Sequence, residues 1–191
     1  MLKSLLILSS LFLAVGLTVF AWFAFTFFKA WNGDGYTAVD KAVSDQYYTK
    51  ENQLYFVSMG NFFSLGAKKI EGADISSFQI LTTEYARDLQ HLYFNGKVVD
   101  SVDLESFQIL SQVYAKDKNS VYILGKSEPR ADLQTFEVFG DSYYAKDKNT
   151  VWYFYGIVEE ADPHSFKALA DPVEGVDHSN SFLRGHLADD S

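Results

Sequence analysis

The residues best suited to acid–base or metal chemistry are the four histidines, His91, His164, His178 and His186. A metal site needs ligands at helix or hairpin spacing, and these positions show no such spacing. His91 and His164 fall at positions of an internal repeat where the other copies carry unrelated residues. We therefore expect neither a metal site nor a cofactor.

Catalytic motifs are also missing from the sequence. Asp117–Asn119 has the acidic start of a calcium-binding loop but lacks the glycine and the distant glutamate that such a loop needs. There is no Gly-x-Ser-x-Gly motif, no glycine-rich phosphate loop and no cysteine. The paired carboxylates Glu159-Glu160 and Asp189-Asp190 occur only as surface charge. The sequence predicts a protein that is not an enzyme, and it nominates no catalytic residue.

The net charge excludes one class of partner. Outside Lys3 and Lys29, 14 basic residues stand against 25 acidic ones, so residues 32–191 carry a net charge of −11. Such a surface repels phosphate backbones, and we expect no nucleic-acid partner. The lack of cysteine also excludes disulfide bonds and a lipid-modified cysteine.

The N-terminal 31 residues predict a membrane anchor. They contain no acidic residue, and Leu5–Phe28 is uncharged. As a helix this stretch would span about 36 Å, enough to cross a hydrocarbon core of about 30 Å. A cleaved signal peptide, with its cleavage site at Val19 and Ala21, is the alternative, but its apolar region is usually only about 7–15 residues long. Cleavage would leave an exposed apolar N-terminus, so we favour an uncleaved anchor.

Charges beside this segment set its expected orientation. Lys3 and the N-terminal amine precede it, whereas Lys29 is soon followed by Asp34 and Asp40. The positive-inside rule then favours a cytoplasmic N-terminus and an exported C-terminal domain.

Small residues form a stripe on the predicted helix, at Ser10, Ala14 and Thr18. Their four-residue spacing places them on one face, where another membrane helix can approach closely. We expect an integral-membrane protein partner on this face. Membrane lipid contacts the aromatic residues of the helix, with Trp31 at the interface.

Four copies of one motif divide the rest of the chain. The segments "GADISSF", "DSVDLESF", "PRADLQTF" and "EEADPHSF" place aspartates at 74, 103, 132 and 162, each with a phenylalanine four residues later. The copies are 29, 29 and 30 residues apart. Copies held in register in this way are typical of repeat proteins, whose neighbouring units share a core.

Between these motifs the chain twice contains "YAKDKN", at 114–119 and 144–149. Short β-branched and aromatic runs flank it, which indicates a hairpin turn with solvated charges. In this turn we expect Asn119 to adopt the left-handed conformation and Asp117 to bond the turn amides. Asp162 followed by Pro163 predicts a short helical turn at each Asp-x-x-(Ser/Thr)-Phe motif, after which the phenylalanine enters the core.

The expected fold is mainly β, with antiparallel hairpin repeats of about 29 residues and short helical turns behind one N-terminal transmembrane helix. We expect an anchor at 1–31, a linker at 32–45, a four-repeat β domain at 46–169 and a loose acidic tail at 170–191. The first copy carries an insertion around "VSMGNFFS", and terminal copies in repeat proteins are usually atypical.

The two later copies resemble the bacterial DKNYY repeat family. They carry its Tyr-x-x-Asp-Lys-Asn turn, its Tyr-bearing strand and its Ala-Asp-x-x-Ser-Phe segment. The resemblance is close over 114–166 and looser over 47–110. It implies a protein of the bacterial cell envelope without an assigned activity. Combined with the expected anchor and its flanking charges, this predicts a single-pass protein of the inner membrane with its C-terminal domain in the periplasm. It carries over no catalytic residue.

The segment "VWYFYG" places four aromatic residues in succession, Trp152, Tyr153, Phe154 and Tyr155. A strand with one exposed face cannot bury all four, so either both faces are covered or one is a contact surface. We favour the contact surface. The leading hypothesis is a non-catalytic interaction or accessory subunit of an inner-membrane assembly. The alternative is an exported ligand-binding module whose aromatic face binds glycan or peptidoglycan.

Overall fold

The computed structural model describes residues 2–31 and 33–188, without the side chains of residues 2–14 and 30. The chain divides into two compact units, residues 1–75 and residues 76–191. Strands in the described part form five antiparallel four-stranded sheets, which we number 1 to 5 in chain order. Sheet 1 belongs to the N-terminal unit, and sheets 2 to 5 belong to the C-terminal unit.

The N-terminal unit joins a long helix to one sheet. Helix α1 runs over Leu2–Trp31 and includes the whole uncharged stretch Leu5–Phe28. It ends where Gly33 adopts a positive φ of 65° and the amide of Asp34 donates to the carbonyl of Lys29. Within the residues that the structure describes, no helix combines the length and the apolar character that crossing a membrane requires.

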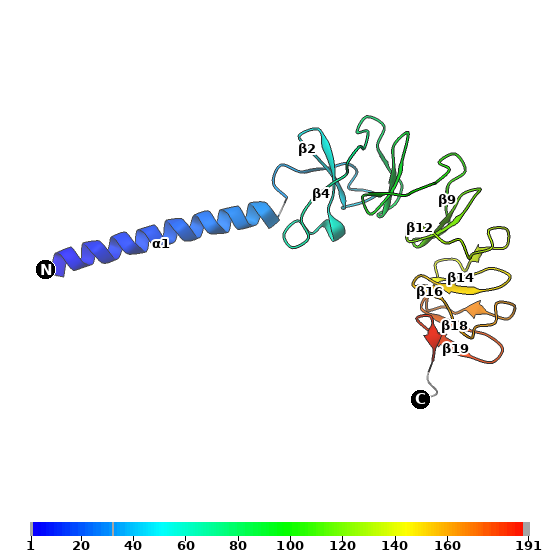
Figure 1. Cartoon of the computed structure of the whole chain (residues 1–191). Coiled ribbons are helices and arrows are strands. Elements are labelled where there is room, and N and C mark those ends of the chain that lie inside the picture. The colour runs from blue at the N-terminus through cyan, green and yellow to red at the C-terminus, as the bar shows by residue number, and fades with distance from the viewer. Residues whose placement is uncertain (1, 32, 189–191) are drawn as a thin grey trace. The chain divides into compact units, whose positions relative to one another are not determined.

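Sheet 1 follows the helix (Figure 1). A long connection, which contains the short 3₁₀-helix η1 at Ser58–Gly60, separates its last two strands. Its strands are β1 Thr37–Ala38, β2 Tyr47–Lys50, β3 Gln53–Phe56 and β4 Lys68–Lys69.

The C-terminal unit repeats one pattern four times, a meander of two short outer strands around a longer central hairpin. Sheet 2 contains β5 Gln79–Ile80, β6 Tyr85–Arg87, β7 Leu92–Phe94 and β8 Lys97–Val98. Sheet 3 contains β9 Gln108–Ile109, β10 Tyr114–Lys116, β11 Val121–Ile123 and β12 Lys126–Ser127. Sheet 4 contains β13 Glu137–Val138, β14 Tyr144–Lys146, β15 Val151–Tyr153 and β16 Gly156–Ile157. Sheet 5 contains β17 Lys167–Ala168, β18 Glu174–Val176, β19 Ser181–Leu183 and β20 His186–Leu187.

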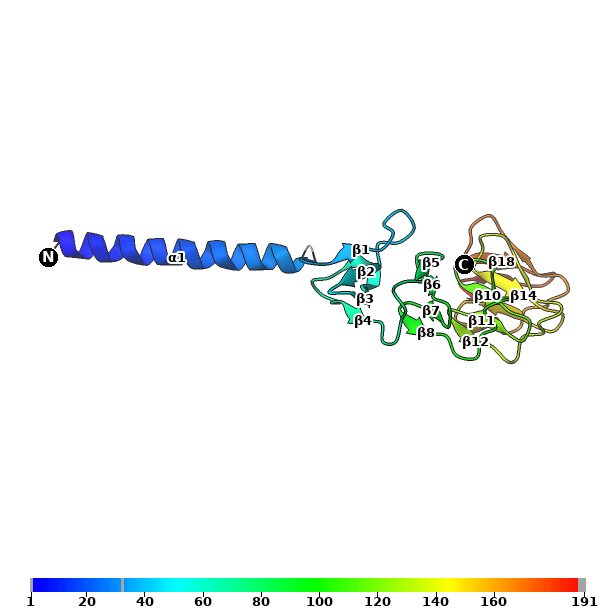
Figure 2. The ribbon, with the colours of Figure 1, turned by 90° about the horizontal axis from the view of Figure 1, so that it is seen from above.

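The core of the C-terminal unit lies between successive sheets. Figure 1 shows the sheets following one another along the chain, and in Figure 2 β10, β14 and β18 lie over one another. Tyr114 and Val121 of sheet 3 pack in one cluster with Trp152 of sheet 4. Tyr153 of sheet 4 packs in another with Phe182 of sheet 5. Sheets 3 and 4 therefore each bury one face on the sheet before and the other on the sheet after.

The mainly β, antiparallel hairpin fold that the repeats predict is confirmed. Each Asp-x-x-(Ser/Thr)-Phe motif forms a single hydrogen-bonded turn, in agreement with the one short helical turn expected there, and no longer helical segment. The amide of Phe166 closes one such turn on the carbonyl of Asp162 at 3.0 Å. Phe136 and Phe166 then enter the core at 6% and 2% exposure, whereas Phe107 is half-buried.

The loose acidic tail expected at 170–191 was wrong for most of its length. Residues 174–187 contain three strands of sheet 5, and Phe182 in the middle strand is 1% exposed. Strand pairing uses main-chain groups, so this segment pairs although it lacks the aromatic and β-branched runs of the earlier copies. Residues 189–191 lie outside the described part of the chain.

Candidate functional site

Each sheet of the C-terminal unit has a four-residue turn between its central strands, and every such turn begins with an aspartate. We call these residues the turn aspartates: Asp88, Asp117, Asp147 and Asp177. The amide of Asp117 donates to the carbonyl of Ser120 at 3.0 Å, which closes the turn. Asn119 is not among the residues with positive φ, so the left-handed conformation predicted for it was wrong.

The carboxylate of Asp117 accepts four hydrogen bonds. Its Oδ1 accepts the amides of Asn119 and Ser120, both at 2.7 Å, as expected for a turn aspartate. Its Oδ2 accepts the amide of Asp103 at 2.7 Å and the hydroxyl of Tyr122 at 2.8 Å. Asp117 is 3% exposed, so the solvated charge predicted for this position was wrong. The carboxylate is a buried junction between the turn, the following strand and the preceding Asp-x-x-Ser-Phe motif.

These bonds decide the protonation state of Asp117. Burial alone would raise the pKa of its carboxyl, but the hydrogen bonds from Asp103, Asn119, Tyr122 and Ser120 outweigh burial and lower the pKa below its usual value. The group is therefore ionised at neutral pH. All four hydrogen bonds to this carboxylate come from the protein itself. Protonation of the carboxylate would disrupt at least one of them, so the group is poorly suited to act as a base.

Asp147 repeats this arrangement in sheet 4. Its Oδ1 accepts the amides of Asn149 and Thr150 at 2.8 and 2.9 Å, and its Oδ2 accepts the amide of Asp132 at 2.8 Å. The indole Nε1 of Trp152 lies 3.3 Å from the same oxygen. A ring donor five residues after the aspartate is thus a recurring part of the turn.

One of these aspartate turns has the sequence Asp117-Lys118-Asn119, and it lies within the part of the chain that a family model matches. The model of the DKNYY family matches residues 21–126, more than half of the 191 residues. The chain belongs to the DKNYY family. The match begins within α1 and ends in β12, so it overlaps the close resemblance predicted over 114–166 only as far as Lys126. Searches of curated proteins and of solved structures gave no match.

Three of the turn aspartates, Asp117, Asp147 and Asp177, accept the amide of a second aspartate, which comes from the Asp-x-x-(Ser/Thr)-Phe motif. We call these second residues the cap aspartates: Asp103, Asp132 and Asp162. Asp103 accepts the hydroxyl of Ser106 at 2.6 Å, and that hydroxyl accepts the amide of Lys118 at 3.0 Å. The ammonium of Lys118 lies 2.6 Å from the carboxylate of Asp103. Hydrogen bonds from Lys118 and Ser106 lower the pKa of Asp103 to about 2. Lys118 therefore joins its turn to the Asp-x-x-Ser-Phe motif that contains Asp103.

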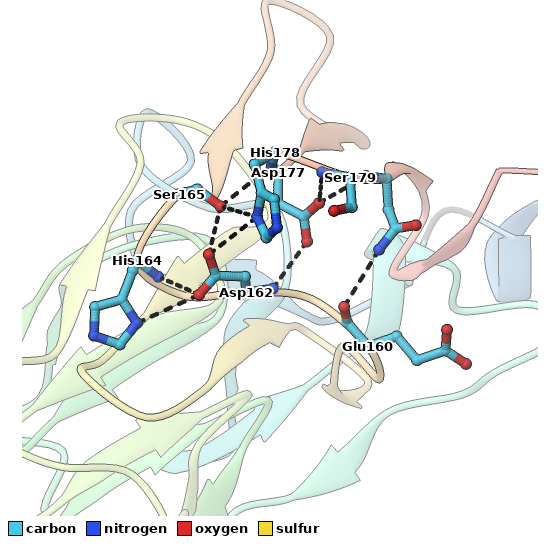
Figure 3. A network of polar contacts seen from close by, with 8 residues as sticks. Glu160, Asp162, His164, Ser165, Asp177, His178 and Ser179 are labelled. Atoms are coloured by element: carbon cyan, nitrogen blue, oxygen red, sulfur yellow. Dashed lines mark hydrogen bonds and ion pairs between the residues drawn. The ribbon is translucent and has the colours of Figure 1, made fainter.

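Sheet 5 has a histidine at the place of this lysine (Figure 3). Nδ1 of His178 lies 3.0 Å from the hydroxyl of Ser165 and 3.3 Å from the carboxylate of Asp162. Ser165 donates its hydroxyl hydrogen to Asp162 at 2.6 Å. In a catalytic triad the acid and the serine contact opposite nitrogens of the histidine. Here both contact the same nitrogen, so the cluster has the geometry of a cap and not of a nucleophile.

The predicted aromatic contact surface is mostly buried. Trp152 is 0% and Tyr153 4% exposed, because β15 lies between the cores that sheet 4 shares with sheets 3 and 5. Phe154 is half-buried, and only Tyr155 is exposed, at 80%. The structure thus shows the other alternative for Trp152 and Tyr153, a strand covered on both faces.

Phe154 and Tyr155 form a tip that the sequence analysis did not separate from the strand. The corresponding turns of sheets 2, 3 and 5 place two left-handed residues there, the second a glycine: Asn95-Gly96, Leu124-Gly125 and Arg184-Gly185. Phe154 and Tyr155 are not left-handed, and their ring centroids lie 3.8 Å apart. The missing glycine was the sequence signal for this aromatic pair, which we call the aromatic tip and of which only Tyr155 is exposed.

The remaining predicted residues are only partly described. The side chains of Ser10 and Ala14 lie outside the described residues, and the hydroxyl of Thr18 donates to the carbonyl of Val15 at 2.8 Å. The small-residue stripe therefore stays a prediction. In the described residues, no group of three or more His, Asp or Glu side chains is arranged to hold a metal ion.

Proposed function

We propose that this protein is a non-catalytic subunit of the bacterial envelope that is anchored in the inner membrane and serves as an interaction or accessory component of an assembly there. Its N-terminus is cytoplasmic and its C-terminal unit periplasmic. The anchor is supported by the uncharged stretch Leu5–Phe28, which lies within the single helix α1. The orientation is supported by Lys3 before this stretch and by the acidic residues after it.

The observation that carries the interaction role is the aromatic tip. Tyr155 is 80% exposed at the end of a hairpin, and its ring lies 3.8 Å from that of the half-buried Phe154, centroid to centroid. Loops on a rigid scaffold are the usual place for binding residues. Aromatic side chains are also enriched at protein interfaces. The tip therefore suits a protein partner.

The repeated polar residues support a structural role for the scaffold behind this tip. The turn aspartates Asp117 and Asp147 bond their own turns, the following strand and a cap motif. Lys118 and Lys148 form ion pairs with the cap aspartates Asp103 and Asp132 of the same motifs. Side chains that hold the sheets in this way are not free to serve as acid, base or nucleophile.

Glycan binding is the second candidate, and the exposed ring of Tyr155 is the observation that favours it. A flat, exposed aromatic ring can stack on a sugar as it can on a protein side chain. Sedimentation of the detergent-solubilised protein with purified cell-wall sacculi separates the two functions, because an accessory subunit stays in the supernatant. The Tyr155→Ala variant must lose any sedimentation that reflects this ring.

Photocrosslinking in native membranes tests the leading proposal. A benzophenone amino acid replaces Tyr155 in one variant and Leu89 in a control, since both side chains are 80% exposed on hairpins of the C-terminal unit. We expect a discrete protein adduct from position 155 and none from position 89. Equal labelling from both positions, or none from either, would contradict the aromatic tip as a contact surface.

The stripe on α1 gives an independent test of the membrane partner. Ala14→Leu places a large side chain in the stripe, while Val15→Leu changes a neighbouring position of the same helix. We expect Ala14→Leu to reduce the amount of integral-membrane protein that copurifies in mild detergent, and Val15→Leu to leave it unchanged. Equal copurification of both variants would remove the stripe from the proposal.

A further inference from the structure

The connection between β3 and β4 differs in length and composition from its counterparts. It spans residues 57–67, whereas the corresponding turns of sheets 2, 3 and 5 have two residues. No charged residue occurs from Leu54 to Ala67, and Lys68 and Lys69 follow directly. We call residues 57–67 the apolar loop. The lack of charge over this length sets the loop apart from the acidic remainder of the protein.

One aromatic ring holds the apolar loop on sheet 1. The ring of Phe62 lies 4.7 Å from that of Tyr48 and 4.9 Å from that of Tyr36, centroid to centroid. It also lies so close to Gly33 that a Cβ atom there would approach its ring to 2.6 Å. Phe62 thus fixes the loop next to the end of α1.

The neighbouring ring joins the loop to the helix itself. Phe63 lies 4.8 Å from Phe27 and 5.3 Å from Trp31, centroid to centroid. Phe27 and Trp31 are four residues apart and share one face of α1. The apolar loop therefore continues the apolar surface of the last helical turn.

Much of this joined surface faces solvent. Met59 is 74% exposed, Phe63 51% and Leu65 41%, and on the adjacent helix Phe28 is 62% and Trp31 55% exposed. Exposed apolar side chains grouped on one loop and on the helical turn that it contacts are typical of an interaction surface. Its continuity with the uncharged helix indicates which surface it meets.

Several main-chain amides of the apolar loop already have hydrogen-bond partners within the protein. The amide of Met59 donates to Oε1 of Gln46 at 3.0 Å, and that of Ser64 to Oδ1 of Asn61 at 2.9 Å. The amides of Gly60, Asn61 and Leu65 donate to carbonyls within the loop. Amides that already have partners lose little when a loop enters a less polar layer.

We propose that the apolar loop lies in the interfacial layer of a phospholipid bilayer, beside Phe28 and Trp31, and seats the N-terminal unit on the membrane. The inference rests on the proposed anchor, because that anchor brings the loop to the bilayer. Aromatic side chains favour the membrane–water interface. Lys68 and Lys69, both exposed, then lie at the level of the lipid phosphates. The anchor is thus continued by a second lipid contact from a distant part of the sequence.

Site-directed spin labelling of the full-length protein in phospholipid vesicles tests the inference. The chain contains no cysteine, so each single-cysteine variant carries one nitroxide. Met59→Cys and Leu65→Cys report on the apolar loop, Phe20→Cys reports on α1, and Leu89→Cys is the exposed control in the C-terminal unit. Collision with oxygen, which concentrates in lipid, is compared with collision with a water-soluble nickel chelate.

We expect labels at 59 and 65 to show a severalfold higher ratio of oxygen to nickel collisions than the label at 89, and a lower ratio than the label at 20. If positions 59 and 65 match position 89 while position 20 is in lipid, the anchor holds and the loop inference is overturned. If position 20 also collides freely with nickel, the proposed anchor itself fails. Loop labels shielded from both reagents would show a protein covering the loop, which also overturns the inference.

Discussion

The amide of Gly185 donates a 2.9 Å hydrogen bond to the hydroxyl of Tyr144, and that hydroxyl donates to the carbonyl of Val173 at 3.1 Å. One tyrosine of sheet 4 thereby joins two segments of sheet 5. One sheet earlier, the hydroxyl of Tyr114 likewise donates to a carbonyl of the next sheet's segment, that of Tyr143 at 2.8 Å. The matching position of sheet 5 is Glu174, which is exposed.

Tyr144→Phe should destabilise the C-terminal unit by about 1–3 kcal/mol, because it leaves the amide of Gly185 and the carbonyl of Val173 without their partner. The measurement is the free energy of unfolding in urea. Tyr155→Phe is the matched control, since its hydroxyl lies on a residue that is 80% exposed. Equal stability of the two variants would show that the tyrosine hydroxyl does not hold sheet 5.

Asp117→Asn should destabilise the protein by at least about 1.5–3 kcal/mol, the usual contribution of a hydrogen bond to a charged group. An amide keeps one acceptor oxygen but presents NH₂ to the amide of Asp103 or to those of Asn119 and Ser120. The control is Asp100→Asn, which changes an exposed carboxylate of the same unit. Chemical denaturation of both variants decides the point, and similar midpoints would refute the structural role of Asp117.

Acid should weaken the repeats within a defined pH range. Bonds from Lys118 and Ser106 to Asp103, and from Ser165 and His164 to Asp162, lower the pKa of these two cap aspartates to about 2. An unfolded aspartate has a pKa of about 3.9. Because the folded pKa is the lower one, the stabilisation is complete above about pH 4 and is lost as pH falls towards 2.

Urea midpoints at several pH values between 7 and 2 measure this loss. Asp103→Asn removes one of the groups that titrate, so its stability should fall less steeply with acid than that of the unchanged protein. An unchanged slope in this variant would mean that Asp103 does not contribute to the acid response.

Spacing alone predicted the hairpins and their repetition, because a strand–turn–strand unit that recurs in register gives the sequence a fixed period. The central role of Asp117 was partly accessible, since an aspartate followed five residues later by Tyr93, Tyr122 or Trp152 recurs in three copies. The amide of Asp103 as a further donor was not accessible. This bond joins two residues that are 14 positions apart, so it depends on the path of the chain between the cap motif and the turn.

Burial of Trp152 and order in sheet 5 were missed for a common reason. Whether a short strand is covered on one face or two depends on the neighbouring sheets, and the pattern of the strand itself does not reveal them. Strand β19 has a single buried aromatic residue, Phe182, yet it pairs through its main chain and packs on Phe166 of its own repeat. The composition of residues 174–187 therefore suggested disorder, although their strands are ordered by pairing and by packing on neighbouring residues.

Gly125→Ala should show that close approach between sheets, as well as backbone conformation, selects glycine in the β11–β12 turn. Gly125 has a φ of +71°, and a Cβ atom there would collide with Cβ and Cγ of Phe94 in sheet 2, atoms that cannot swing away. Gly140 has a φ of +53° with open space around it. Both alanine variants bear the left-handed penalty of roughly 1–2 kcal/mol. Only Gly125→Ala adds the overpacking cost of about 1–3 kcal/mol, so its urea midpoint should be the lower, and equal midpoints would rule out the contact between sheets 2 and 3 as the reason for glycine.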